Sequence, residues 1–234
     1  MNQSAAIGGQ SLVKTAIEAV KSHIREAEMR VGDVLPGEAV FAEQHGVSRA
    51  VMREAFGALA ALRLIDVANG RRARVGALDG SVIAASLDHA ISTAQIRVSD
   101  VWDVRRTIEM RTAGLAAQNA TPRQAARIVA LAEAMFSDNE PHASTTDEDI
   151  EFHLAIAEAS GNALFHQIVQ SFVPLMRVAV PKAWHTRRTV EERADILDRH
   201  RKLAQAIADG DSAEARRWMG LHFDESIGAL LRED

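Results

Sequence analysis

Residues 34–75 contain two short helical patterns separated by a tight turn, and no other stretch constrains the fold as strongly. We expect the first helix over residues 38–44 and the second over residues 49–62, where apolar side chains recur at helical spacing. Between them, Gly46 supplies the positive φ that favours a sharp helix exit. Ser48 is a good N-cap, because its hydroxyl can accept a backbone N–H of the second helix.

The residues that follow the second helix have the pattern of a β-hairpin. Residues 64–67 favour a strand, Asn69-Gly70 is a typical two-residue turn, and residues 73–75 favour the return strand. Two helices, a turn and a hairpin in this order predict a winged helix-turn-helix.

Two arginines lie where such a motif meets DNA. Arg49 and Arg53 are four residues apart, so they share one face of the second helix. The start of that helix is where a helix-turn-helix reads base edges and contacts phosphates. The alternative is a small helical subdomain with solvated arginines. The candidate DNA-binding residues, with Arg49 and Arg53 first and the wing second, are Ser48, Arg49, Arg53, Asn69, Gly70, Arg71 and Arg72.

Several short runs here resemble the GntR family of bacterial transcription regulators, over residues 11–76. The resemblance rests on Leu35-Pro36, Glu38, Ser48-Arg49 and Arg53-Glu54-Ala55. It implies a DNA-binding regulator and not an enzyme. Two positions depart from the family: Ala39 replaces an arginine that contacts DNA in many members, and Ala73 replaces the second wing glycine.

The distribution of charge fits a DNA-facing head on an acidic body. Residues 1–77 contain 10 of the 27 Lys and Arg and 8 of the 32 Asp and Glu, a net charge of +2, and the remainder has a net charge of −7. The net charge of −5 argues against a generic nucleic-acid coat protein. Because +2 is a weak basic footprint, affinity would come from a few placed arginines and from pairing two heads in a homodimer.

Location and redox chemistry follow from what the sequence lacks. It has no cysteine, which excludes disulfides and thiolate metal sites. No apolar run reaches the ~18 residues of a membrane span, and the N-terminus lacks the order of a signal peptide. We therefore expect a cytoplasmic protein without a membrane partner.

The rest of the chain is predicted to be almost entirely helical. Residues 1–10 suggest disorder, and residues 12–30 form an amphipathic helix of the head. Two glycines in residues 76–80 indicate a hinge. We therefore expect a mostly α protein: a winged helix-turn-helix DNA-binding domain over residues 1–77 and an all-α bundle for effector binding and dimerisation over residues 78–234. The bundle helices are expected over residues 82–91, 99–119, 122–137, 146–160, 162–180 with a kink at Pro174, 189–209 and 211–231.

A carboxylate and three imidazoles are predicted to converge in the bundle. Asp149 and His153 are four residues apart on one helix face, while His200 and His222 fall on the inward sides of the last two helices. Such a set suits a divalent transition metal. Equally open at this point are histidines that only bond to core carbonyls and an Asp149 that only caps its helix.

The same residues resemble the FCD-type effector domain of the FadR subfamily of GntR regulators. The subfamily has an Asp-x-x-x-His pair followed by two histidines on the last two helices. The resemblance implies that Asp149, His153, His200 and His222 bind a metal, zinc first, with nickel or manganese as alternatives. It further implies that open coordination positions receive a carboxylate effector.

The resemblance also points to residues for that effector. The subfamily has an Arg-x-x-Leu/Ile-Glu element, and the expectation taken from it is that Arg106, in Arg106-Thr107-Ile108-Glu109, binds the carboxylate in bidentate fashion. Arg105 faces about 100° away on a helix and is expected to have no such role. The alternative for Arg106 is a surface ion pair. The further effector candidates are Asn162, Arg177 and Trp184.

The leading interpretation is a homodimeric repressor on a palindromic operator, released when a sugar acid or hydroxy acid binds the metal-containing pocket. One alternative is a metal-responsive regulator in which the ion itself is the effector. The other is a metal-dependent hydrolase, because three histidines and an aspartate can activate water.

Overall fold

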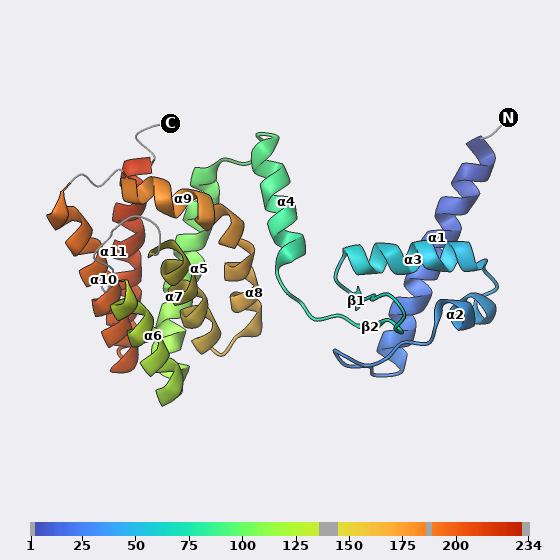
Figure 1. Cartoon of the computed structure of the whole chain (residues 1–234), viewed down its shortest axis with the longest axis horizontal. Coiled ribbons are helices and arrows are strands. Elements are labelled where there is room, and N and C mark those ends of the chain that lie inside the picture. Colours follow the sequence, from blue (N-terminus) through green and yellow to red (C-terminus); the bar gives the residue numbers. More distant parts are fainter. Residues whose placement is uncertain (1–2, 136–144, 186–188, 231–234) are drawn as a thin grey trace. The chain divides into compact units, whose positions relative to one another are not determined.

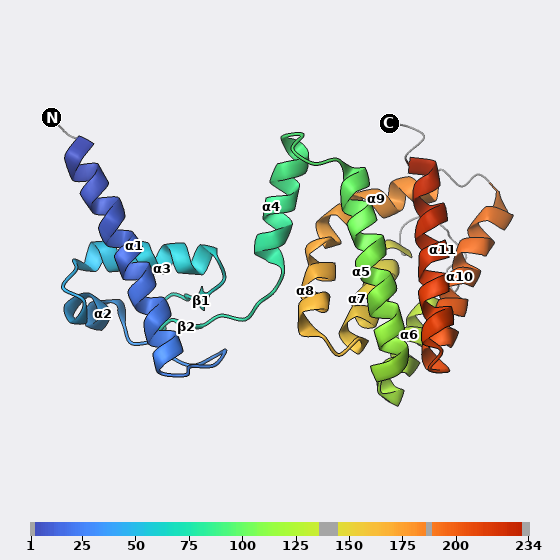
Figure 2. The same ribbon diagram turned by 180° about the vertical axis from the view of Figure 1, so that it is seen from behind.

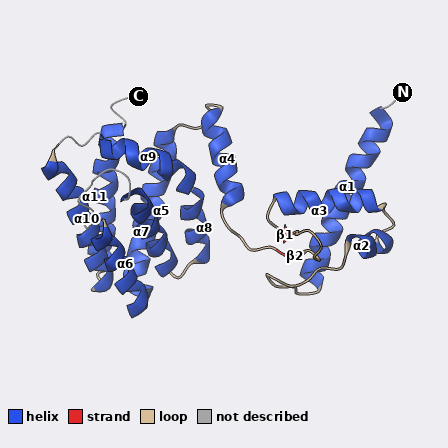
Figure 3. Ribbon diagram, in the orientation of Figure 1, coloured by secondary structure: helices blue, strands red, loops and turns tan. Residues whose placement is uncertain are grey.

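The computed structural model describes residues 3–135, 145–185 and 189–230 of the chain (Figure 1). The chain divides into two compact units, Met1–Val82 and Ile83–Asp234. The described secondary structure is helical apart from one small sheet in the first unit (Figure 3). The predicted mostly α fold is confirmed.

The first unit is a winged helix-turn-helix. It contains α1 (Gln3–Glu26), α2 (Glu38–Gln44), α3 (Arg49–Ala61), β1 (Ile65–Asp66) and β2 (Arg74–Val75). The two strands are antiparallel, with Ile65 opposite Val75 and Asp66 opposite Arg74. Val34 adds an isolated bridge to Arg74, which ties the chain before α2 to the wing.

One apolar cluster holds this unit together. Phe41 of α2, Met52 and Leu59 of α3, and Val20 of α1 are completely buried in it. The Ser48 hydroxyl accepts the Val51 N–H at 3.2 Å, which confirms the predicted N-cap of α3.

The first helix differs from the sequence prediction at both ends. It begins at Gln3, within the stretch expected to be disordered, because a helix once nucleated adds one hydrogen bond for each residue fixed. It ends at Glu26, before the expected Arg30, and Glu28 then takes a positive φ of 48°.

The wing closes on α3 through a close backbone approach at Gly76. Its N–H donates to the Leu64 carbonyl at 3.0 Å. A Cβ at Gly76 would lie 2.4 Å from the carbonyl oxygen of Arg63, so this position accepts only glycine without a shift of the backbone.

The second unit is built from helices alone among the described residues. They are α4 (Ser81–Ser92), α5 (Val98–Asn119), α6 (Pro122–Ala134), α7 (Thr145–Ala159), α8 (Ala163–Ser171), α9 (Val173–His185), α10 (Val190–Ala208) and α11 (Ser212–Leu230). Figure 2 shows α5 beside α11, and α5 also packs on α7, while α10 packs on α11 and α6.

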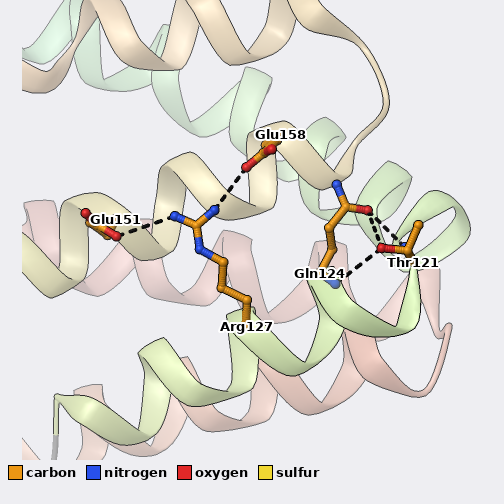
Figure 4. Close-up of polar contacts among 5 residues, drawn as sticks. All are labelled: Thr121, Gln124, Arg127, Glu151 and Glu158. Atoms are coloured by element: carbon orange, nitrogen blue, oxygen red, sulfur yellow. Dashed lines mark hydrogen bonds and ion pairs between the residues drawn. The ribbon is translucent and has the colours of Figure 1, made fainter.

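Capping residues fix several of these helix starts. Thr121 and Gln124 form a capping box at the start of α6, with Pro122 in its first turn (Figure 4). Thr189 and Glu192 form a capping box at the start of α10. Two turns into α6, Arg127 reaches the Glu151 and Glu158 carboxylates of α7 at 3.5 and 3.1 Å (Figure 4). The helix expected to begin at Ser99 begins one residue earlier, at Val98, because Arg97 caps it with Asp100 and Ser99 does not.

The long kinked helix expected over residues 162–180 is two helices. α8 ends at Ser171, and α9 begins at Val173 with a bend of 54° between them. Pro174 lies in the first turn of α9, where its missing N–H costs nothing, and so it marks a helix start and not a kink. No single described helix is long and apolar enough to cross a membrane; the bent pair Ala163–Ser171 and Val173–Lys182 passes by length and composition only.

α5 and α11 approach each other closely at one point. The Ser212 hydroxyl donates to the Gly114 carbonyl at 2.8 Å. A Cβ at Gly114 would lie 2.8 Å from the Arg216 side chain and 3.1 Å from the Ser212 hydroxyl oxygen. The small residue at position 114 therefore sets how closely these two helices pack.

Candidate metal centre and DNA-contacting surface

The four residues predicted as metal ligands lie together inside the bundle. Asp149 and His153 come from α7, His200 from α10 and His222 from α11, and one donor atom of each lies within 4.8 Å of all the others. All four residues are buried. Metal–ligand bonds of about 2.0–2.2 Å in a tetrahedral site place the ligands about 3.4 Å apart, so the most distant donors would need to draw together by about 1 Å.

Two imidazoles are oriented by the groups behind them. His200 Nδ1 lies 2.9 Å from the carbonyl oxygen of Ile196, so Nδ1–H donates there and Nε2 faces Asp149 Oδ1 at 3.1 Å. His153 Nδ1 makes an ion-pair contact with Glu109 Oε2, and its Nε2 lies 3.9 Å from Asp149 Oδ1.

Two ring nitrogens at the centre have no protein partner. Among the described residues, His153 Nε2 and His222 Nδ1 are buried without a hydrogen bond. A buried polar atom without a partner costs roughly 1–3 kcal/mol and calls for an explanation. Histidines that only bond to core carbonyls would not leave these atoms unsatisfied, and a bound cation would satisfy both.

The local charges favour the protonation states that a metal requires at His222 and Asp149. Burial lowers the pKa of His153, but the neighbouring Glu109 carboxylate outweighs that effect and raises it. Burial and the neighbouring His200 and His153 lower the pKa of His222 well below its usual range, so its ring is neutral. Burial raises the pKa of Asp149, but the neighbouring imidazoles of His200 and His153 outweigh that effect and lower it. A carboxylate and neutral imidazoles suit a divalent transition metal.

Two residues that the sequence prediction missed adjoin this centre. Arg105 and Glu109 of α5 are 2% and 1% exposed, and Arg105 Nε donates to Glu109 Oε1 at 2.8 Å. The guanidinium also stacks on Trp102, 4.1 Å from the ring centroid. The signal was present in the sequence, because both residues continue the inward face that starts at Trp102, at spacings of three and four.

Arg106 does not point to this centre. Its side chain is 37% exposed and forms a bidentate pair with Asp224 of α11, at 2.8 and 3.0 Å. The surface ion pair left open as an alternative is therefore what this arginine forms. The 100° step between the two positions turns Arg105, which was not expected to bind the effector, inward in place of Arg106. The five-position pattern Arg-x-x-Ile-Glu that ends at Glu109 also begins at Arg105 and not at Arg106.

The other effector candidates are scattered. Asn162 caps α8, with its side-chain oxygen accepting the Leu164 N–H at 3.0 Å, and it is exposed. Arg177 is exposed and pairs with Asp147 at 3.3 Å. Trp184 is buried on α9, the helix that packs on α7 and α11.

The predicted DNA-binding arginines are exposed to solvent, in contrast to the buried residues of the candidate metal centre. Arg49 and Arg53 are exposed on the first turns of α3, and Arg53 makes only a 3.5 Å contact with Glu38. In the wing, Asn69, Arg71 and Arg72 are also exposed, and Gly70 takes the predicted positive φ, 71°.

Two protein-family models match the chain. The model described as bacterial regulatory proteins of the gntR family matches residues 12–75, and that of the FCD domain matches residues 100–225.

Individual proteins with similar sequences are transcriptional regulators. The chain is 28% identical over 203 residues to the HTH-type transcriptional regulator LutR of Bacillus subtilis, covering 85% of this chain and 92% of that protein. It is 30% identical over 225 residues to a putative L-lactate dehydrogenase operon regulatory protein of Escherichia coli, covering 93% and 85%. It is 29% identical over 194 residues to the galactonate operon transcriptional repressor of Escherichia coli, covering 78% and 82%. Among solved structures, Streptococcus agalactiae GntR has the same fold, with a TM-score of 0.67 at 23% identity, covering 95% of this chain and all of that one.

Proposed function

The chain belongs to the gntR family of bacterial regulatory proteins, and on that basis we propose that it is a metabolite-responsive repressor. It is a DNA-binding transcriptional regulator and not an enzyme, because its matched domains and its relatives are regulators. The metal-dependent hydrolase is thereby set aside. In this proposal residues 1–77 bind DNA, and residues 78–234 bind the effector and dimerise.

The observation that carries the proposal is the set of four buried donors within 4.8 Å, two of whose nitrogens lack a protein partner. FCD domains commonly bind a metal. Zinc is our first choice, because three imidazoles and one carboxylate match its ligand preferences, with nickel and manganese as alternatives. When bound, the ion would supply a Lewis-acid anchor for a carboxylate.

The proposed effector is a small hydroxycarboxylate. Two relatives are named for an L-lactate dehydrogenase operon and a galactonate operon, and both of these anions are hydroxycarboxylates. We assign the effector's acid group to Arg105 in place of Arg106, because Arg105 is buried and pairs with Glu109, whose other oxygen contacts His153. Trp184 remains our candidate for a wall of the pocket.

The proposed output is loss of operator binding. Regulators of this family typically act as dimers, and a homodimer would place two α3 helices in successive major grooves of a palindromic site. Effector binding would favour an arrangement of the bundle in which the two heads no longer match both half-sites. A repressor of this kind acts where the chromosome is, in the cytoplasm.

The experiment is a DNA-release titration. A duplex selected in vitro for binding to the whole protein is followed by fluorescence anisotropy, with zinc-loaded and chelator-treated protein and with L-lactate, D-galactonate or acetate added. Release by one hydroxycarboxylate from the zinc-loaded protein alone is the expected result. Release of DNA by zinc without any organic acid would instead favour the metal-responsive regulator. Release that depends on neither zinc nor an organic acid would overturn the proposal.

A further inference from the structure

We propose that Glu109 is the positioning residue of the metal centre: its carboxylate accepts the Nδ1–H of His153, so that Nε2 carries the free lone pair. This inference rests on the proposed metal site. It assigns a role to a buried acid that is not itself among the four donors.

The three histidines of the centre have different groups behind them. His153 has the Glu109 carboxylate and His200 has the Ile196 carbonyl at 2.9 Å, while the unpaired Nδ1 of His222 is one of the two nitrogens left for the cation. Ligating histidines in proteins usually donate their second N–H to a carboxylate or a carbonyl, which fixes the tautomer and raises the basicity of the ligating nitrogen. A carboxylate does so more strongly than a carbonyl, so His153 is the best-supported ligand of the three.

Arg105 fixes which oxygen of Glu109 is available. Its Nε–H donates to Oε1 at 2.8 Å, which leaves Oε2 for His153. The stacking of the guanidinium on Trp102 and its contact with Phe223, at 4.1 and 5.1 Å, keep Arg105 in place. With Oε1 taken by Arg105 and Oε2 facing His153 Nδ1, the His153 proton finds an acceptor on Nδ1, which leaves Nε2 for the centre.

A simpler role for Glu109 would be to neutralise Arg105, which is nearly inaccessible to solvent. That role would need only one carboxylate oxygen and would leave the orientation of His153 to its packing. The two roles differ in what an amide at position 109 does, and this difference makes the proposal testable.

In Glu109→Gln an amide replaces a carboxylate that accepts from both Arg105 and His153, and the amide has only one accepting oxygen. Arg105 Nε–H is always a donor, so the amide oxygen turns to Arg105 and the amide NH2 turns to His153. His153 Nδ1 must then accept, and its proton moves to Nε2, the atom that faces the centre. We expect zinc affinity to fall about 10–100-fold, the usual cost of losing such a partner.

Removing the Arg105 donor should partly reverse the effect. In Arg105→Met/Glu109→Gln the amide is free to turn its oxygen to His153, and zinc affinity should rise again relative to the single variant. The matched control is Asp224→Asn, which removes the same charge from the exposed partner of Arg106 and should leave zinc affinity within about twofold of wild type.

The experiment has two readouts on the full-length protein. Zinc affinity is measured by competition with a chelating dye, and the protonated nitrogen of His153 is read by ¹⁵N NMR of metal-free protein at alkaline pH, with His200 and His222 as internal reporters of an intact fold. The expected result is a proton on Nδ1 in wild type and on Nε2 in Glu109→Gln, with the drop and partial recovery of affinity described above.

Other outcomes separate the two proposals. Wild-type tautomer and wild-type zinc affinity in Glu109→Gln would overturn the role of Glu109. Absence of zinc binding by the wild-type protein would overturn the proposed metal centre, and the tautomer of His153 in metal-free protein would still decide whether Glu109 positions it.

Discussion

The two units of the protein place their candidate functional residues in opposite settings. In the head, Arg49 and Arg53 are exposed, and neither belongs to the apolar cluster that holds α1, α2 and α3 together. In the bundle, His153 and His200 are 1% and 2% exposed and pack against Phe152, with ring centroids 5.8 and 5.2 Å apart. The candidate DNA-binding residues of the head thus lie outside its hydrophobic core, while the candidate metal ligands of the bundle lie within its core.

The largest effect on stability is expected for Arg105→Leu. It leaves the Glu109 carboxylate buried beside His153 without its arginine, at a cost of about 3–5 kcal/mol in the free energy of unfolding of the bundle. Chemical denaturation of the full chain measures it. Arg106→Leu is the matched control and should cost at most about 1 kcal/mol, because its pair with Asp224 is exposed. Equal losses of unfolding free energy in Arg105→Leu and Arg106→Leu would contradict the difference between the buried and the exposed ion pair.

Metal should stabilise one unit and not the other. Free zinc at about 1,000 times its dissociation constant is expected to add about 4 kcal/mol to the bundle and nothing to the head. Hydrogen exchange resolved by peptide, with zinc or with chelator, reads the two units separately. His200→Ala should abolish the response; protection that also rises in the head would show that the units are coupled in stability.

Gly76→Ala tests whether the stability of the head depends on the close backbone approach at Gly76. The stability of the head is not expected to depend on Arg49 and Arg53. The added Cβ would meet the Arg63 carbonyl oxygen at 2.4 Å, so we expect a loss of about 1–3 kcal/mol in the head. Gly57→Ala in α3 has open space around its Cβ and should instead gain up to about 1 kcal/mol. Thermal denaturation of both variants measures the difference, and a neutral Gly76→Ala would contradict the close approach.

Arg53→Ala should have the smallest effect on stability, within about 0.5 kcal/mol. Its affinity for the selected duplex should nevertheless fall by about 1–3 kcal/mol, because a base or phosphate contact is lost. Anisotropy titrations measure the affinity. Arg127→Ala removes the same charge from the bundle and serves as the control; unchanged DNA binding in Arg53→Ala would remove this residue from the recognition helix.

The fold could be predicted largely because its signals are local. The Ser48 cap and the start of α6 at Thr121-Pro122 each depend on a few neighbouring residues, and both are confirmed. Asn69-Gly70 forms a turn, in which the Arg71 N–H donates to the Ala68 carbonyl at 3.1 Å, but the turn lies within a loop over residues 67–73 and not in a two-residue hairpin. The break between α8 and α9 was missed, because a proline in the first turn of a helix and a proline that kinks one have the same local sequence.

The candidate site was predictable only in part, because it depends on helix rotation. The i, i+4 spacing of Asp149 and His153 is enough to put them on one face. The choice between Arg105 and Arg106 depends on the rotation of α5 about its axis, for which the spacing from Trp102 was a signal that the prediction did not use. The stacking of Arg105 on Trp102 and Phe223, at 4.1 and 5.1 Å, shows that Arg105 is the arginine that turns inward.

The close contact between Gly114 and Ser212 has a mechanical consequence. It pins α5 to α11 at one point, and at 1.5 Å per residue Glu109 lies about 8 Å and His222 about 15 Å along the helices from that point. A tilt of about 5° about the pin would therefore displace His222 by about 1 Å, several times the ±0.2 Å that metal–ligand distances tolerate. If α5 and α11 pivot at this contact, metal occupancy of the proposed centre and the angle between the two helices would change together.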